Sequence, residues 1–354
     1  MWKNNVEFFL GSKSKQGFVS LFAQLQQPTQ ISRTYILKGG PGSGKSTLMR
    51  KLGTYLQNQG HEIEWIPCAS DPKSLDAIID YTTRTAMLDG TAPHVVDPVH
   101  PGAVETVVNA GDAWDEAMLE RHRDAIVALT AQIDHCHAQA SAYVTAAGAL
   151  LDRSRTVASA YVDGLAVNRW VEALAARLKP GDKASEQKRL LSAVSVGEMK
   201  FFDGTLRTMC DTVYTVADEW GAASGQLLER LRERALALGV RVITCYCSVR
   251  IPEKIDHLIF PDDRLAVTTV NDFHATIHPE TLPVEGLSRP LPEVLRSDLW
   301  QSYHTVRDLL EQACDLVARS KALHDDLEGF YVAAMDFTKL DLVYEDLRRA
   351  MESQ

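Results

Sequence analysis

The chain is short of cysteine, long apolar runs and positive charge, and each shortage excludes a class of protein. Six cysteines among 354 residues are too few for a disulfide-stabilised scaffold. Residues 141–151, the longest nearly apolar run, fall far short of the roughly 20 residues that span a bilayer. The net charge of −10 repels nucleic acid and anionic lipid. Residues 1–17 also lack the apolar core of a secretory signal. We therefore expect a cytoplasmic protein with neither membrane nor nucleic acid as a partner.

The most informative segment is residues 34–52, which read TYILKGGPGSGKSTLMRKL. The apolar residues Tyr35 to Leu37 predict a buried strand, and good helix formers from Ser46 onward predict a helix. Residues 39–46 between them fit GxxxxGKS/T, a pattern typical of nucleoside triphosphate binding in this context. The glycines let backbone N–H groups converge on phosphate at a helix N-terminus. We expect ATP to contact Gly39, Gly40, Pro41, Gly42, Ser43, Gly44, Lys45, Ser46 and Thr47.

Two loop residues and one distant carboxylate have specific expected roles at this site. Lys45 is expected to reach the β and γ phosphates, and the Ser46 hydroxyl is expected to ligate Mg²⁺. A second Mg²⁺ ligand usually follows a neighbouring strand, and Asp89 ends the short apolar run 85–88. A turn-forming Asp89–Gly90 pair is the alternative interpretation. Because glycine and not glutamate follows Asp89, we do not expect rapid hydrolysis.

Asp71 is a third candidate carboxylate. Residues 61–66 predict the next strand, and Asp71 follows its carboxyl end, where ligands bind in open α/β sheets. At that place Asp71 is suited to hold or deprotonate an acceptor hydroxyl. Alternatively, it caps a helix that we expect over residues 73–80.

The second half of the chain repeats the first in an almost ungapped register. The repeat aligns a set of identical residues: Tyr35 with Tyr214, Cys68 with Cys247, Asp76 with Asp256, Arg84 with Arg264 and His94 with His274. It also aligns Gly39 with Asp218, Lys45 with Ser224 and Asp89 with Thr269. An acid within the cradle repels phosphate, so the second P-loop is predicted to be degenerate, with one nucleotide per chain. Because a histidine stands at position 94 and at its repeat, we expect His94 to be structural, although it lies near the expected γ phosphate.

Each predicted core is followed by a long helical segment. Residues 119–150 and 306–330 carry mostly apolar residues at alternating spacings of three and four, a coiled-coil pattern that is imperfect at His122. A second helix is expected after each, which gives two helical hairpins. These arms either pack on each other or across a dimer, or they carry the nucleotide state to a protein partner.

The predicted units are residues 1–195 and 196–354. In the first, the core covers about residues 1–111 and the helical arm about 112–180. In the second, the core covers about residues 196–290 and the arm about 296–352.

Several stretches resemble a largely uncharacterised family of bacterial tandem P-loop ATP-binding proteins. They are Phe8-Phe9-x-Gly11 and residues 36–53, 68–79, 89–98 and 101–116. The resemblance implies an α/β fold of two P-loop NTPase-like units with mainly parallel sheets, each followed by a helical segment, and ATP as the ligand. It implies no substrate. The second unit of that family commonly keeps its own P-loop, and residues 218–225 depart from this pattern.

These observations favour a Mg²⁺-dependent, slow or partner-regulated ATPase or molecular switch with one active site. One alternative is a small-molecule or nucleotide kinase in which Asp71 or Asp97 handles the acceptor. Another is a non-enzymatic scaffold that ATP stabilises. No Asn-Lys-x-Asp sequence is present, which disfavours GTP.

Overall fold

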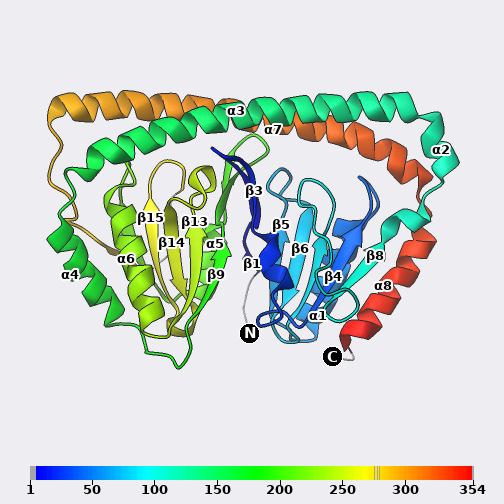
Figure 1. The fold of residues 1–354 in the computed structure, drawn as a ribbon, viewed down its shortest axis with the longest axis horizontal. Helices are drawn as coiled ribbons and strands as arrows, with labels where there is room; N and C mark the ends of the chain where they lie inside the picture. Colours follow the sequence, from blue (N-terminus) through cyan, green and yellow to red (C-terminus); the bar gives the residue numbers. More distant parts are fainter. Residues whose placement is uncertain (1–4, 275, 277, 279, 353–354) are drawn as a thin grey trace.

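Two six-stranded sheets stand beneath a pair of long helices in the computed structural model (Figure 1), which describes residues 5–352 except 275, 277 and 279. The fold is α/β, with mixed sheets that are mostly parallel. Among the residues described, no helix combines the length and the apolar character needed to cross a membrane.

The first sheet has the spatial order β1 (Val6–Glu7), β5 (Ile63–Pro67), β6 (Leu75–Asp80), β7 (Thr85–Asp89), β4 (Arg33–Lys38) and β8 (Glu105–Asn109). Neighbouring strands are parallel except around β6, which runs antiparallel to β5 and β7. Helix α1 (Lys45–Asn58) follows β4, and its apolar residues Leu48, Met49 and Leu52 pack on the sheet. The expected strand, loop and helix around residues 35–52 are therefore confirmed.

The helix expected over residues 73–80 is wrong, because most of that segment forms strand β6. All six residues of β6 are buried, so the strand shows no alternation of apolar and polar residues. The β-branched pair Ile78 and Ile79 favours the extended conformation. Its two acids are satisfied locally, since Asp76 lies 3.0 Å from His94 and Asp80 lies 2.8 Å from His61.

The second sheet repeats this order as β9 (Ser185–Arg189), β13 (Arg241–Tyr246), β14 (Ile255–Phe260), β15 (Leu265–Val270), β12 (Thr212–Ala217) and β16 (Thr281–Pro283). Its antiparallel strand is β14, and α6 (Ala223–Ala237) is the counterpart of α1. Arg84 and Arg264 are aligned by the sequence repeat and share a left-handed backbone, with φ of 57° and 51°. The two halves thus have one topology. Because β9 belongs to this sheet, the second sheet begins before residue 196.

Each half also contains smaller elements, which begin in both with a hairpin followed by a short helix and then differ. The first half has the hairpin β2 (Gly11–Ser14) and β3 (Gly17–Ser20) and the short helices η1 (Phe22–Gln26) and η2 (Ala110–Ala113). The second half has the hairpin β10 (Ser192–Val194) and β11 (Met199–Phe201), then α5 (Asp203–Met209), η3 (Ser248–Arg250) and η4 (Pro261–Asp263).

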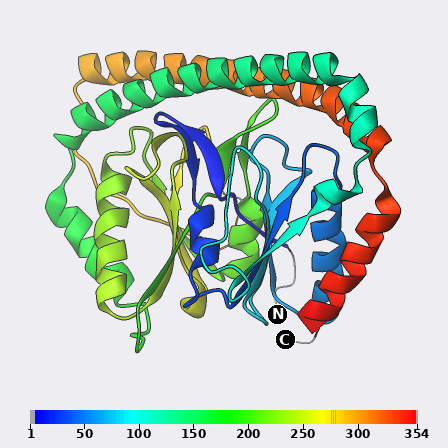
Figure 2. The same ribbon diagram turned by 45° about the vertical axis from the view of Figure 1, so that its right-hand side comes forward.

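The long helices cross from one half to the other. Following α2 (Glu116–Arg121), α3 (Arg123–Ser159) lies along α7 (Glu293–Ala334), and both extend over the two sheets (Figures 1 and 2). Bridges between Trp114 and Met335 and between Val162 and Ser288 show that the pair is antiparallel. The break between α2 and α3 falls at His122, where the heptad pattern is imperfect.

The short helices that follow pack on the opposite half, so the helical hairpins expected within each unit do not form. Helix α4 (Gly164–Ala175) packs on α6 of the second half. Helix α8 (Phe337–Glu352) packs on α1 of the first half, where Leu347 and Met351 join the cluster around Met49.

The buried seam of α3 follows the predicted positions at Ile133, Cys136, Ala140 and Ala147 and departs from them at two others. Val144 and Leu151 are buried, whereas the heptad spacing predicted positions 143 and 150. A straight helix with 3.6 residues per turn drifts away from a seven-residue repeat, which moves the seam by one position along α3.

A buried ion pair joins the two sheets. The Nε atom of Arg189 on β9 donates to Oε1 of Glu64 on β5 at 2.5 Å. Arg189 is 2% exposed and Glu64 is 1% exposed. The Tyr81 hydroxyl donates to the other Glu64 oxygen at 2.6 Å. Burial disfavours the charged guanidinium, but Glu64 outweighs it and raises the pKa of Arg189. The same region holds one apolar cluster that includes residues of both halves, so the sheets do not form separate cores.

Removing one member of this pair should destabilise the whole molecule. Arg189→Met leaves the Glu64 carboxylate buried without its cation, and we expect the free energy of unfolding to fall by about 3–5 kcal/mol in urea denaturation. Adding Glu64→Gln should recover most of the loss. Arg241→Met is the matched control, because its partner Asp262 is exposed and the cost should stay below about 1 kcal/mol. Equal losses for Arg189→Met and Arg241→Met would contradict the role of the pair.

Candidate phosphate-binding site and its counterpart

Residues 39–44 form a tight loop between β4 and α1. Gly42 and Gly44 have positive φ angles of 65° and 78°, a backbone that strains residues with side chains. Helix α1 begins at Lys45, so its N-terminus, with unpaired N–H groups and the positive end of the helix dipole, faces the loop. This is the strand-loop-helix arrangement that anion binding requires.

Lys45 and Asp89 lie together beside this loop, as expected. The Lys45 ammonium donates to the carbonyl oxygens of Gly39 and Gly40 at 2.6 and 2.8 Å and lies 3.5 Å from Asp89 Oδ2. Asp89 is placed by the parallel pairing of β7 with β4, in which it stands opposite Leu37. Its other oxygen accepts hydrogen bonds from the backbone and hydroxyl of Thr91. The adjacent ends of two parallel strands therefore bring the cation and the carboxylate together.

Ser46 and Thr47 begin the first turn of α1. The Ser46 hydroxyl oxygen accepts a hydrogen bond from the Leu75 backbone at 2.9 Å, which leaves one lone pair for a cation. Thr47 is exposed. Both residues therefore lie at the start of the helix that follows the loop, as the sequence predicts.

Asp71 lies in the turn between β5 and β6 and caps no helix. It accepts hydrogen bonds from the Lys73 backbone at 3.2 Å and the Ser74 hydroxyl at 3.0 Å. Its third contact is with Lys321 of α7, at 3.5 Å. Asp97, the other acceptor-handling candidate, pairs with Lys38 at 2.9 Å and has a largely exposed side chain. In the part of the chain that the structure describes, both acids are thus held by partners other than Lys45 and Asp89.

Residues from the second half of the chain cover the loop. A Cβ atom on Gly42 would lie 2.9 Å from Val332 of α7, and one on Gly44 would lie 2.5 Å from Leu340 of α8. Gly40 faces Tyr331 in the same way, at 3.2 Å. No local sequence pattern indicates this cover, because helical periodicity shows which face of a helix is apolar and not which core it meets.

Two side chains that were not assigned to the site lie beside it. His94 Nε2 is 3.0 Å from Asp76 Oδ2, and the two residues are 5% and 7% exposed. Burial opposes protonation of His94, but Asp76 and Asp89 outweigh it and raise the pKa of the imidazole. The sequence feature that could have identified Asp76 and His94 is the internal repeat, because both residues are identical in the second half.

The equivalent loop of the second half holds one of the protein's own carboxylates. Asp218 stands where the first half has Gly39, and its Oδ1 accepts from the backbone N–H of Trp220 and Gly221 at 3.3 and 3.0 Å. Its Oδ2 accepts from the N–H of Ser224 at 2.7 Å. The carboxylate thus takes the hydrogen bonds that a bound anion would take.

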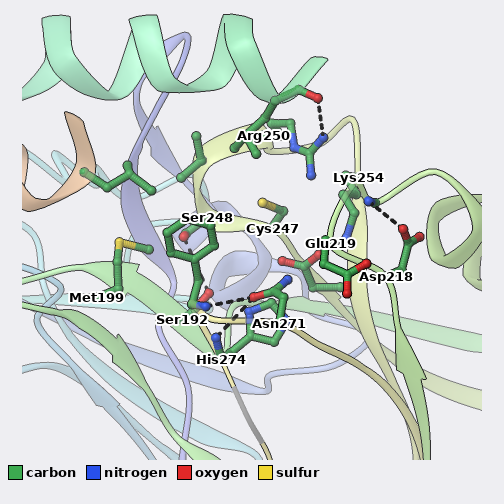
Figure 3. A pocket seen from close by; sticks show the side chains of 16 residues that line it. Ser192, Met199, Asp218, Glu219, Cys247, Ser248, Arg250, Lys254, Asn271 and His274 are labelled. Carbon is green, nitrogen blue, oxygen red and sulfur yellow. Dashed lines mark hydrogen bonds and ion pairs between the residues drawn. The ribbon is translucent and has the colours of Figure 1, made fainter. Parts of the chain in front are cut away.

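The adjoining cavity is small (Figure 3). Its volume is about 40 Å³, and it is lined in part by Asp218, Arg250, Lys254 and His274. Sites for ligands of drug size measure about 300–1,000 Å³. This cavity therefore has no room for a nucleoside triphosphate.

Removing the internal carboxylate should expose its donors. Asp218→Ala leaves three backbone N–H groups without their acceptor, so the free energy of unfolding should fall by about 1–3 kcal/mol. Inorganic phosphate should then raise the melting temperature of Asp218→Ala more than that of the unchanged protein. Glu219→Ala is the control, since this neighbouring acid is exposed. Equal stabilities of the two variants, with no phosphate effect, would contradict the role of Asp218.

No protein family model, curated protein or solved structure matches this chain. Its own residues are therefore the guide to its function.

Proposed function

We propose that the protein binds one Mg²⁺–ATP per chain at residues 39–47 and acts as a slow or partner-regulated ATPase or molecular switch. The observation that carries the proposal is the convergence of Lys45 and Asp89 at a glycine loop that ends at the N-terminus of α1. A cation, a carboxylate and backbone donors in this arrangement are the parts that a metal-bound triphosphate needs. The resemblance of the sequence to tandem P-loop ATP-binding proteins agrees with it.

The residues present fit the bound groups. In the second half, a loop of the same topology places three backbone N–H groups around a carboxylate, so this backbone shape suits an anion. In the first half, Lys45 would leave the carbonyl oxygens of Gly39 and Gly40 for the β and γ phosphates. Ser46 and Asp89 would hold the metal ion, which supplies charge neutralisation at the phosphates.

Two features favour a slow or regulated reaction. Gly90 follows Asp89, so the chain places no carboxylate next to it to activate water. The loop lies against Val332 of α7, one of the long helices that extend over both halves, and against Leu340 of α8, the helix that follows α7. A change in the loop on binding or hydrolysis therefore acts directly on α7 and α8.

A kinase is the less supported alternative. Both carboxylate oxygens of Asp71 are engaged, by its own turn and by Lys321, and Oδ1 of the largely exposed Asp97 pairs with Lys38. An ATP-stabilised scaffold would use the same loop without turnover.

The test is Mg²⁺-dependent ATP turnover without an added acceptor. Lys45→Ala removes the cation expected on the β and γ phosphates, and we expect turnover to fall by about 100-fold or more. Ser224→Ala is the matched control, because Ser224 occupies the aligned position in the second loop, where no nucleotide is expected. Turnover that is unchanged in Lys45→Ala would contradict the proposed site. Tight binding without turnover would favour the scaffold.

A further inference from the structure

Beyond the phosphate loop, three metal-ligating side chains meet at the same edge of the first sheet. Cys68 follows β5, Asp76 lies in β6 and His94 follows β7. One ligand atom from each lies within 4.8 Å of the other two. The residues come from three separate segments, so the tertiary fold and not local sequence brings them together.

The surrounding residues fix two of these ligands in place. Asp76 holds His94 through Nε2 at 3.0 Å, and the rings of Phe18 and Phe22 lie against the imidazole, with centroids 5.2 and 4.6 Å away. Cys68 is partly exposed, which leaves one side of the cluster accessible. A thiol, an imidazole and a carboxylate together suit a borderline divalent cation of the Zn²⁺ class better than Mg²⁺, which prefers oxygen.

The aligned residues of the second half have a cation of the protein beside their carboxylate. Cys247, Asp256 and His274 occupy the aligned positions, and there the ammonium group of Lys254 forms an ion pair with Asp256. Lys254 and Asp256 are each 3% exposed. The aligned residue of the first half is Ser74, which carries no charge. In the second half, the Lys254 ammonium group therefore neutralises the Asp256 carboxylate. In the first half, the aligned Ser74 supplies no positive charge to Asp76.

Two buried lysines of the first half form their hydrogen bonds with groups other than Asp76. Lys13 donates to His137 Nδ1 at 2.9 Å; burial lowers its pKa to about 8 and the nearby Cys68 acts against that shift, so this ammonium group lies close to the cluster without pairing with its carboxylate. Lys45 donates to loop carbonyl oxygens. The Asp76 carboxylate thus pairs with His94. A metal ion bound by both residues would replace this direct contact.

We propose that Cys68, Asp76 and His94 bind one divalent transition-metal ion of the Zn²⁺ class. Bonds of about 2.0–2.3 Å to sulfur, nitrogen and oxygen bridge atoms this close after small side-chain shifts. The S–H bond of Cys68 breaks as the S–metal bond forms, and the thiol proton goes to solvent; His94 ligates as the neutral imidazole, so a protonated His94 releases its second proton to solvent as well. Thiolate and carboxylate then balance the ion's two positive charges, and a fourth position stays open to water. These three ligands are different residues from Ser46 and Asp89, the proposed Mg²⁺ ligands nearby, and metal binding by them does not require ATP.

The test is a Co²⁺ titration of the full chain in excess Mg²⁺, which saturates oxygen-only sites. Thiolate ligation gives a charge-transfer absorption in the near ultraviolet, and we expect it to saturate at one Co²⁺ per chain and to disappear when Zn²⁺ is added. Cys68→Ser should abolish the absorption. Asp76→Asn and His94→Gln should keep sulfur ligation while weakening affinity by more than about 10-fold.

Cys247→Ser is the matched control, since this thiol has the aligned position next to Lys254. It should leave both the absorption and the affinity unchanged. Absence of the absorption in the unchanged chain, or its persistence in Cys68→Ser, would overturn the proposal. If Cys68→Ser does not fold, full affinity in both Asp76→Asn and His94→Gln would overturn it as well.

Discussion

The antiparallel pairing of α3 with α7 decides which core each of the following helices covers. Because both helices extend over the two sheets, α3 delivers α4 to the second sheet and α7 delivers α8 to the first. The phosphate loop is consequently covered by Val332 and Leu340, which come from the other half of the sequence. The buried contact of Arg189 with Glu64 joins the sheets below this helix pair. The two repeats are thus parts of one folding unit rather than two domains in series.

The two halves share one topology but carry different charged residues at the aligned loop and cluster positions. In the second half, the Asp218 carboxylate accepts hydrogen bonds from the loop backbone, and the Lys254 ammonium group pairs with Asp256. The aligned residues of the first half, Gly39 and Ser74, leave both positions without a charge. The second half therefore satisfies its loop donors with its own carboxylate, and in the proposed function the aligned donors and acids of the first half serve ligands from solution. The second half also carries the helices α7 and α8, whose residues cover the glycine loop of the first half.

The sequence predicted what local patterns determine. The loop of residues 39–46, its flanking strand and helix and the position of Asp89 follow from short-range propensity, and the repeat predicted the common topology. Strand β6 was missed because a strand buried on both faces lacks alternation. The packing of α4 on the second half and of α8 on the first was not predicted, because amphipathic spacing does not show which distant element a helix contacts. The contact between Asp76 and His94 was not predicted, because nothing in the local sequence links a residue of β6 with one that follows β7.

The most direct test of this account is the number of nucleotides bound per chain, measured by native mass spectrometry with Mg²⁺ and a non-hydrolysable ATP analogue. The account predicts one bound nucleotide, because the first loop combines the N-terminus of α1 with Lys45, while Asp218 accepts the hydrogen bonds of the second loop. Two bound nucleotides would show that Asp218 does not block its loop. No bound nucleotide would show that the loop of residues 39–47 is a structural turn.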